Sequence, residues 1–350
     1  MSTSLFLYCR PGFEGECAAE IQQRAQYQGS DGYCRAKPDS GYVVFVPHDV
    51  TQLRRLTLSV RLTDLVFARQ WFELIELCKD LAVDDRVAGL MQAIATAQVT
   101  IAELLIDTPD TNEAKELQPL CRALQRPLST ALERAGMLDA AGWRLHVCFI
   151  ATHVAYVGIS PLAASSPWAM GIRRLKFPAG APSRSTLKLE EALLTLLSDD
   201  ERQRLLRSNQ TAVDLGAAPG GWTWQLVRRG LHVTAVDNGA LAPALLASGQ
   251  VEHLRADGFH YRPASPVDWM VCDMVEQPAR IAELVVRWIT QRWCRHTVFN
   301  LKLPMKKRYA EVQQCRQQIE DGLRDTDYRL RCKQLYHDRE EVTCYLGLRE

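Results

Sequence analysis

Apolar and polar positions in the second half of the chain follow two periods in turn. Residues 189–197 place leucine and alanine at the i, i+3, i+4 and i+7 spacing of an amphipathic helix. Further helices are expected at 222–229 and 278–288, separated by the apolar runs TAVDLG, LHVTAVD, DWMVCD and HTVFNLK. Strands that alternate with helices form a parallel, doubly wound sheet. Two final runs, 329–335 and 342–348, indicate an antiparallel hairpin at its edge.

The first half of the chain has a more mixed pattern. The runs LFLYC and YVVFV flank a helical stretch at 14–24, which is typical of a small α+β fold. Residues 65–71 are strand-like, and helices are expected at 87–97 and 113–124, the second preceded by the capping sequence DTN. Two more strands are expected at 144–151 and 153–159.

A stretch rich in proline, glycine and serine separates the two halves and indicates a linker. We therefore expect four segments, at 1–60, 61–165, 166–184 and 185–350.

Composition excludes several classes of protein. With 47% hydrophobic and 24% charged residues the chain is able to bury a core, unlike a disordered chain. No apolar run approaches the length of a membrane span, and residues 1–10 lack the pattern of a signal peptide. The 11 cysteines contain no CxxC pair, so we expect reduced thiols, no metal site and a cytoplasmic location. The net charge of +1 means that any nucleic acid is held by a local basic patch.

The sequence DLGAAPGGW carries the strongest signal for a cofactor. A strand is expected to end at Asp214, after which Gly216, Gly220 and Gly221 allow a ligand to approach the backbone. Asp237 ends the next strand, where a carboxylate accepts hydrogen bonds from the ribose hydroxyls of an adenosine cofactor. A dinucleotide site is disfavoured, because its fingerprint is GxGxxG rather than GxxxGG with a proline inside. Asp257 follows a third run and is expected near the adenine, although an Asp-Gly pair is also common in turns.

This motif resembles the S-adenosylmethionine-binding motif of RNA ribose 2′-O-methyltransferases. That family carries a catalytic Lys-Asp-Lys-Glu tetrad, and the matching residues here are Lys188, Asp273, Lys302 and Glu341. The proline that follows the family's Asp-Met pair is absent, because Val275-Glu276 comes after Met274, so the loop that frames the target nucleotide is expected to differ.

The resemblance extends along nearly the whole chain to one family, the bacterial enzymes that 2′-O-methylate a cytidine in the peptidyl-transferase region of 23S ribosomal RNA. The sequence stretches that resemble this family are CRPGFEGECAAEI, ARQWF, DTNEAKEL, CRAL, MGIRRLKFPAGAPSRSTLKLEEA and FNLKLPMKKRY. It implies an α/β fold in which a ferredoxin-like and THUMP RNA-binding region precedes a Rossmann-like methyltransferase domain with a seven-stranded sheet.

The resemblance also implies a set of cofactor-binding residues and a partner. For S-adenosylmethionine the set is Ser185, Asp214, Gly216, Ala218, Pro219, Gly220, Gly221, Trp222, Asp237, Asp257 and Asp273. The expected partner is 23S ribosomal RNA, free or in a precursor particle, bound by a monomer, with neither DNA nor a membrane involved.

A lysine acts as a general base only when it is neutral, yet its reference pKa is about 10.4. A second lysine about 4 Å away contributes about 4 kcal/mol toward the neutral form at an effective dielectric constant of about 20. We assign Lys302 as the base, Asp273 as its orienting partner, and Lys188 and Glu341 as supporting groups. The carboxylates favour protonated lysine, and the sequence leaves open which effect dominates. Taken alone, Lys188 and Glu341 fit surface ion pairs equally well.

Two basic segments without acidic residues are expected at the mouth of this site. A phosphate-binding rim is one interpretation, and a solvated charged surface is the alternative. The candidates are Arg173, Arg174, Lys176, Arg184, Lys306, Lys307 and Arg308. Nearby Trp168, Phe177 and Tyr309 are candidates for stacking on a flipped base, although an isolated aromatic residue is more often part of a core.

Other functions remain open on the residues alone. A base-directed methyltransferase is the nearest, but the Asn/Asp-Pro-Pro-aromatic sequence of guanine enzymes is absent and Cys272 fits a buried thiol. The pair His337-Asp338 suggests acid–base chemistry, yet a hairpin turn explains it better. An RNA-binding assembly protein with a methyltransferase fold is the third possibility, and the retention of all four tetrad residues argues against it.

Overall fold

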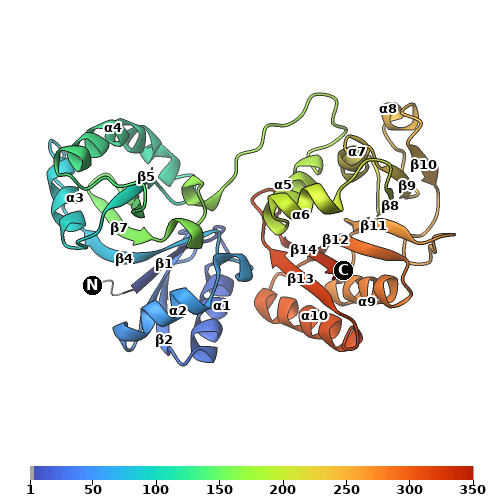
Figure 1. The fold of residues 1–350 in the computed structure, drawn as a ribbon, viewed down its shortest axis with the longest axis horizontal. Helices are drawn as coiled ribbons and strands as arrows, with labels where there is room; N and C mark the ends of the chain where they lie inside the picture. The colour runs from blue at the N-terminus through green and yellow to red at the C-terminus, as the bar shows by residue number, and fades with distance from the viewer. Residues whose placement is uncertain (1–3, 350) are drawn as a thin grey trace. The chain divides into compact units, whose positions relative to one another are not determined.

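The computed structural model describes residues 4–349 and divides into two compact units, Met1–Arg173 and Arg174–Glu350, each built on a seven-stranded sheet (Figure 1). No helix within the described range has the length and apolar character needed to cross a membrane.

The sheet of the first unit has the order β2-β3-β1-β4-β7-β6-β5. Its neighbours are antiparallel except for β5 and β6, which are parallel. Because β1 pairs with β4, the segments before and after residue 60 share one continuous sheet. The strands are β1 (Ser4–Tyr8), β2 (Gly32–Ala36), β3 (Tyr42–Pro47), β4 (Gln70–Cys78), β5 (Ile101–Asp107), β6 (Trp143–Ala151) and β7 (Val154–Ser160).

Helices cover this sheet in two groups. Helix α1 packs against β2 and β3, whereas α3 and α4 pack against the β4–β7–β6–β5 half. A core cluster forms there, in which Leu90, Leu128 and Leu132 pack with strand residues such as Val147 and Phe149. The helices are α1 (Glu14–Tyr27), α2 (Leu53–Ser59), α3 (Arg86–Ala95) and α4 (Gln118–Arg134), with 3₁₀ turns η1 (Val50–Gln52), η2 (Leu62–Asp64), η3 (Ala114–Leu117), η4 (Leu162–Ala164) and η5 (Ala169–Gly171).

The prediction of a strand over 65–71 is wrong for its first half. Residues 65–68 are buried but lie outside the sheet, and β4 begins at Gln70. The buried carboxylate of Glu20 accepts hydrogen bonds from the backbone N–H groups of Val66 (2.7 Å) and Phe67 (2.9 Å). These donors are therefore satisfied without a strand partner, so an apolar run that looks like a strand forms a buried loop.

The helix expected at 113–124 begins later and extends further. Thr111 Oγ1 accepts the N–H of Ala114 (3.0 Å) in the 3₁₀ turn η3, and α4 then runs on through Pro127 to Arg134. The DTN sequence thus provides one side-chain hydrogen bond at the start of η3, whose N-cap residue is Glu113, and it does not cap α4 itself.

The sheet of the second unit has the order β10-β9-β8-β11-β12-β14-β13. The first five strands are parallel, β14 is antiparallel to β12, and β13 is antiparallel to β14. The predicted doubly wound sheet with an edge hairpin is confirmed. The strands are β8 (Thr211–Leu215), β9 (His232–Val236), β10 (Val251–Leu254), β11 (Val267–Cys272), β12 (Cys294–Lys302), β13 (Tyr328–Lys333) and β14 (Glu341–Leu348).

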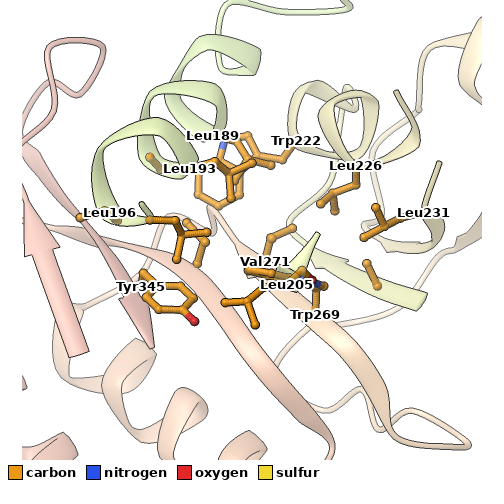
Figure 2. Close-up of a cluster of buried hydrophobic side chains, with 14 of the residues drawn as sticks. Leu189, Leu193, Leu196, Leu205, Trp222, Leu226, Leu231, Trp269, Val271 and Tyr345 are labelled. Carbon is orange, nitrogen blue, oxygen red and sulfur yellow. The ribbon is translucent and has the colours of Figure 1, made fainter. Parts of the chain in front are cut away.

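Apolar helix faces cover both sides of this sheet. Figure 2 shows one core, in which Leu189 and Leu193 of α5 and Trp222 of α7 pack against Val271 of β11 and Tyr345 of β14. Truncation of a fully buried leucine such as Leu189 costs about 2–5 kcal/mol, so this contact fixes α5 firmly. The helices are α5 (Thr186–Leu196), α6 (Asp199–Leu205), α7 (Gly221–Val227), α8 (Pro243–Leu246), α9 (Pro278–Thr290) and α10 (Arg308–Gly322).

Candidate active site

The glycine-rich turn lies between β8 and α7, as predicted. Gly216 has φ +79° and Gly220 has φ +109°, values that other residues rarely adopt. An added Cβ on Gly221 would collide with Ser185 Oγ and lie 2.6 Å from Ser183 Oγ. The turn is therefore shaped by glycine and packed against the two serines before α5, which brings the predicted Ser185 to the cofactor motif; Ser183, hydrogen-bonded to it at 2.6 Å, was not predicted.

The predicted acidic residues lie at the ends of consecutive strands in different states. Asp214 is buried: its Oδ2 accepts from Thr223 Oγ1 (2.6 Å), and its Oδ1 has no hydrogen-bond partner in the part of the chain that the structure describes. Burial raises the pKa of Asp214 to about 7, and nearby Asp273 adds to this. Asp237 is held by the N–H groups of Ala218 (2.9 Å) and Gly239 (2.7 Å).

Asp257 is about half exposed, with 54% of its side-chain surface accessible. Its carboxylate accepts the N–H of Phe259 (2.8 Å) and contacts His260 Nδ1 (2.7 Å), and the first of these bonds lowers its pKa. The adjacent Gly258 approaches the Met274 side chain, since an added Cβ would lie 2.9 Å from its Sδ. Gly216 approaches the same side chain, so the turn that contains Asp257 and the glycine-rich turn both lie against Met274.

These features fit an adenosine-type cofactor. The orphaned buried Oδ1 of Asp214, the glycine turn and the fixed carboxylate of Asp237 all belong to the carboxyl end of the parallel sheet, where such folds bind ligands.

The four candidate catalytic residues converge at this same end of the sheet. Lys302 Nζ donates to Asp273 Oδ1 (2.5 Å) and to Glu341 Oε2. Lys188 Nζ donates to Glu341 Oε1 and lies 3.5 Å from Asp273 Oδ2. Each ammonium thus contacts both carboxylates, which gives a closed ring of two positive and two negative charges.

Strand register explains this convergence. Lys302 ends β12 directly opposite Glu341, the first residue of β14. Asp273 follows the last residue of β11, the parallel neighbour of β12 on its other side. Lys188 lies in the first turn of α5, which packs against β14. Four elements that are distant in sequence therefore deliver one side chain each.

These contacts decide in which direction the pKa of Lys302 is shifted, which the sequence left open. Burial lowers its pKa, but the charges of Asp273 and Glu341 outweigh that effect, so the pKa of Lys302 is raised above its ordinary value. Without a ligand Lys302 is an ammonium at neutral pH.

A second layer of buried polar residues supports the ring and was not predicted. Asn300 Nδ2 donates to Asp273 Oδ1 (2.7 Å), and Asn300 Oδ1 lies 2.7 Å from Thr343 Oγ1. Asn300 precedes Lys302 by two residues and Thr343 follows Glu341 by two, so the two-residue period of a strand placed them on the same face. That period was the available signal for both residues.

The pair His337-Asp338 lies in the β13–β14 connection, as the turn interpretation requires, but both side chains are tied to other elements. His337 contacts Glu191 of α5 through its backbone N–H (2.9 Å) and its Nδ1 (2.6 Å). Asp338 is buried and contacts Thr343.

The predicted RNA-binding residues are less uniform than the sequence suggests. Lys176, Arg184, Lys306 and Lys307 are exposed. Arg308 instead pairs with Glu340 (2.7 Å) and retains only 15% of its side-chain exposure.

Two arginines of this set lie over aromatic rings. The guanidinium of Arg173 lies 5.0 Å from the Trp168 ring centre, within the first unit. That of Arg174 lies 5.7 Å from the Tyr336 ring centre, within the second unit. Among the candidate stacking residues, Phe177 and Trp168 are 51% and 43% exposed, so neither belongs to a core, and Tyr309 is half-buried.

Two exposed apolar side chains flank the tetrad in sequence and were not predicted. Val275, two residues after Asp273, is 90% exposed, and Met305, three residues after Lys302, is 91% exposed. They follow β11 and β12, two neighbouring strands that end at the site.

Comparison with known proteins identifies the family. The chain is 53% identical over 350 residues to ribosomal RNA large subunit methyltransferase M of Methylococcus capsulatus, covering 99% of this chain and 98% of that protein. The chain belongs to the ribosomal RNA large subunit methyltransferase M family. Members from Thauera aminoaromatica and Shewanella amazonensis are each 49% identical, over 98% and 99% of this chain and 95% and 98% of theirs.

Family models of single domains match successive parts of the chain and agree with this family. Residues 1–72 match the RlmM ferredoxin-like domain, residues 85–161 match the N-terminal model of ribosomal RNA large subunit methyltransferase M, and residues 181–316 match the FtsJ-like methyltransferase. The predicted ferredoxin-like start and S-adenosylmethionine-dependent ribosomal RNA methyltransferase are confirmed by this family membership.

Proposed function

We propose that this protein transfers a methyl group from S-adenosylmethionine to the ribose 2′-hydroxyl of a cytidine in the peptidyl-transferase region of 23S ribosomal RNA. The observation that carries the proposal is the closed ring of Lys188, Asp273, Lys302 and Glu341 beside the glycine turn. The relatives are named ribosomal RNA large subunit methyltransferase M, which supports the substrate class. The choice of cytidine rests on the family resemblance.

The chain's own residues have distinct roles in this proposal. Lys302 Nζ takes the proton of the 2′-hydroxyl, and Asp273 and Glu341 hold Nζ in place. When bound, S-adenosylmethionine supplies a methyl group on a cationic sulfur, and positive charge near Nζ favours the neutral amine that a base requires. Lys188 adds positive charge to the same carboxylates and so acts in the same direction.

The cofactor is held by the residues at the carboxyl ends of β8, β9 and β11. Asp237 accepts from the ribose hydroxyls, the glycine turn admits the cofactor close to the backbone, and Ser185 and Asp214 face its methionine end. Asp257 borders the adenine. Ala218, Pro219, Trp222 and Asp273 complete the proposed cofactor set.

The proposal also assigns the domains of the chain and its contacts with RNA. We assign residues 1–60 to a ferredoxin-like subdomain, 61–165 to a THUMP RNA-binding domain, 166–184 to a linker and 185–350 to the methyltransferase domain. The exposed cations Lys176, Arg184, Lys306 and Lys307, with Arg173, Arg174 and Arg308, contact RNA phosphates. The protein acts as a cytoplasmic monomer on ribosomal RNA, without DNA or a membrane as a partner.

The experiment that tests the proposal maps the product. Protein-free 23S ribosomal RNA and large-subunit precursor particles are incubated separately with methyl-labelled S-adenosylmethionine and the protein. The RNA is then digested to nucleosides for mass spectrometry. We expect 2′-O-methylcytidine as the labelled nucleoside, in at least one of the two substrates.

Label on the cytosine ring, or on another base, would contradict the proposal. Absence of label from both substrates, while the protein binds S-adenosylmethionine, would favour an RNA-binding assembly protein instead.

A further inference from the structure

A chain of buried hydrogen bonds leads away from Asp273 into the protein interior. Asn300 contacts Asp273 Oδ1 (2.7 Å) and Thr343 Oγ1 (2.7 Å), and Thr343 Oγ1 lies 3.0 Å from each carboxyl oxygen of Asp338. Asn300, Thr343 and Asp338 are at most 1% exposed. This chain connects a residue of the β13–β14 connection to the tetrad through β14 and β12.

The number of available protons decides how these contacts are made. Asp273 faces two ammonium groups and is an acceptor, so Asn300 turns its NH₂ toward Asp273 and its carbonyl toward Thr343. Thr343 has one hydroxyl proton, which it donates to that carbonyl. Its contact with Asp338 then lacks a proton unless Asp338 supplies one.

The oxygens of Asp338 are arranged to allow this. Asp338 Oδ2 accepts the backbone N–H of Leu335 (2.9 Å), which leaves Oδ1 to carry a proton toward Thr343 Oγ1 (3.0 Å). Each contact along the chain then contains one hydrogen, whereas an ionised Asp338 leaves one of the contacts between Asn300, Thr343 and Asp338 without a hydrogen.

We propose that Asp338 is a buried, protonated carboxyl group and a positioning residue, which orients Asp273 by donating through Thr343 and Asn300. With Asp338 as the fixed donor, the chain has one direction: Asp338 to Thr343, Thr343 to Asn300, and Asn300 to Asp273. The carboxylate of Asp273, which holds Lys302, is thereby fixed on its interior side by Asn300. The effect on methyl transfer rests on the proposed function, whereas the protonation of Asp338 does not.

The charges around Asp338 agree with its protonation. Glu341 of β14 and Glu191 of α5 both disfavour a further negative charge, while Lys188 of α5 favours it. His337, its neighbour in the connection, is engaged by Glu191. Burial is the largest influence and, with Glu341, raises the pKa of Asp338 to about 8.

Infrared spectroscopy tests the protonation without any assay of activity. A difference spectrum between the wild-type protein and Asp338→Asn at pH 7, on protein with isotope-labelled aspartate, should contain the C=O band of one protonated carboxyl group. The band should vanish as the pH rises above about 8. A difference spectrum that contains only carboxylate bands at pH 7 would overturn the proposal.

Kinetics test the positioning role. Asn at position 338 offers an N–H to Thr343 and an oxygen to Leu335, so Asp338→Asn should retain kcat at pH 7, whereas Asp338→Ala should lower kcat about tenfold with little change in KM. When Asp338 ionises in the wild type, the Thr343 hydroxyl donates its proton to Asp338. The side-chain carbonyl of Asn300 then no longer accepts a hydrogen bond from Thr343. The ratio of kcat for Asp338→Asn to that of the wild type should therefore rise severalfold between pH 7 and pH 9.5.

Thr343→Val provides a second route if Asp338→Ala does not fold. It removes the hydroxyl at constant shape and should lower kcat like Asp338→Ala, while Thr343→Ser should retain it. A loss of kcat in Asp338→Asn as large as that in Asp338→Ala would show that a carboxylate is required, and would overturn the proposal. If the wild type fails to methylate RNA, the proposed function fails while the infrared result still decides the protonation.

Discussion

The two seven-stranded sheets differ in where they place their charged groups. In the first unit the buried side chains of Tyr8, Arg144 and His146 each have a different partner: Tyr8 donates to Asp107, Arg144 pairs with the exposed Glu103 (2.8 Å), and His146 contacts Ser160 (2.7 Å). In the second unit the charges of Lys188, Asp273, Lys302 and Glu341 share one ring, and Asp214 keeps an oxygen without a described partner.

Strand direction explains this difference. Antiparallel neighbours end alternately at opposite edges, so residues at strand ends are distributed over both edges of the first sheet. Strands β8, β9, β11 and β12 are parallel, so their carboxyl ends lie on the same side of the sheet, and the last residues of neighbouring strands lie next to each other. The same number of strands therefore brings four charged side chains together in the second unit, whereas the first unit distributes its strand ends over both sides of the sheet.

The largest effect is expected from the loss of Lys302. Because Lys302 is the proposed base, Lys302→Ala should lower kcat by about 10²–10⁴-fold, while binding of S-adenosylmethionine changes little. Single-turnover methylation and calorimetric titration of the cofactor measure the two quantities. Lys37→Ala, an exposed lysine of the first unit, is the matched control and should leave both unchanged. Near-normal kcat in Lys302→Ala would refute its role as base.

A change in one of these polar contacts of the first unit should affect stability instead. The carboxylate of Asp107 accepts from Tyr8 and from the N–H of Met170 (2.7 Å), and burial raises its pKa to about 6, so it is ionised at pH 8. Asp107→Ala leaves two buried donors without an acceptor and should lower the free energy of unfolding by about 2–4 kcal/mol.

Chemical denaturation at pH 8 measures this change, and Asp84→Ala, at an exposed position, is the control. The kcat of the folded Asp107→Ala protein should remain close to that of the wild type. A large loss of kcat with unchanged stability would remove the distinction between the two sheets.

A smaller effect is expected from the turn that holds the cofactor. The added methyl group of Gly221→Ala collides with Ser185 Oγ and comes within 3.0 Å of the Thr186 backbone nitrogen, so the start of α5 must move. The Kd for S-adenosylmethionine should rise about tenfold, which corresponds to about 1.4 kcal/mol. Gly15→Ala, where an added Cβ meets no atom within 4 Å, is the control. An unchanged Kd would mean that the serines adapt and that the turn is not a tight cradle.

Those features of the fold and of the site that depend on strand ends and on sequence motifs could be predicted from the sequence. The doubly wound sheet, the edge hairpin and the convergence of Lys302 with Asp273 follow from residues at the ends of apolar runs, whose positions a parallel topology makes equivalent. The strand expected at 65–71 is partly wrong because Glu20, distant in sequence, takes the backbone donors of the loop. Strand β5 and helix α10 were not predicted, since α10 carries polar residues throughout most of its length.

The electrostatics of the site depend on distances that no sequence pattern contains. Whether lysine or carboxylate neighbours dominate the pKa of Lys302 is decided by contacts that form only in the folded chain. The link from Asp338 through Thr343 to Asn300 likewise requires the register of β12 and β14. Arg308, a rim candidate by sequence, pairs with Glu340, whereas Lys306 and Lys307 remain exposed.

The smallest effect is expected from the exposed cations Lys306 and Lys307. Their charges lie in solvent, whereas the charges of the tetrad are paired with one another. Lys306 and Lys307 make no ion pair with the residues that the structure describes, so the net attraction that each offers to a phosphate is screened by salt. Replacing both by Glu should weaken binding of ribosomal RNA severalfold, and should reduce the slope of log Kd against log salt concentration by about 1 for each phosphate that the protein no longer neutralises. Filter binding at several salt concentrations measures both quantities, with Lys37→Glu and Lys79→Glu as controls of equal charge change in the first unit. Since these lysines lie outside the tetrad, kcat at saturating RNA should stay the same, and a fall in kcat with an unchanged salt slope would place them in the catalytic ring rather than at its rim.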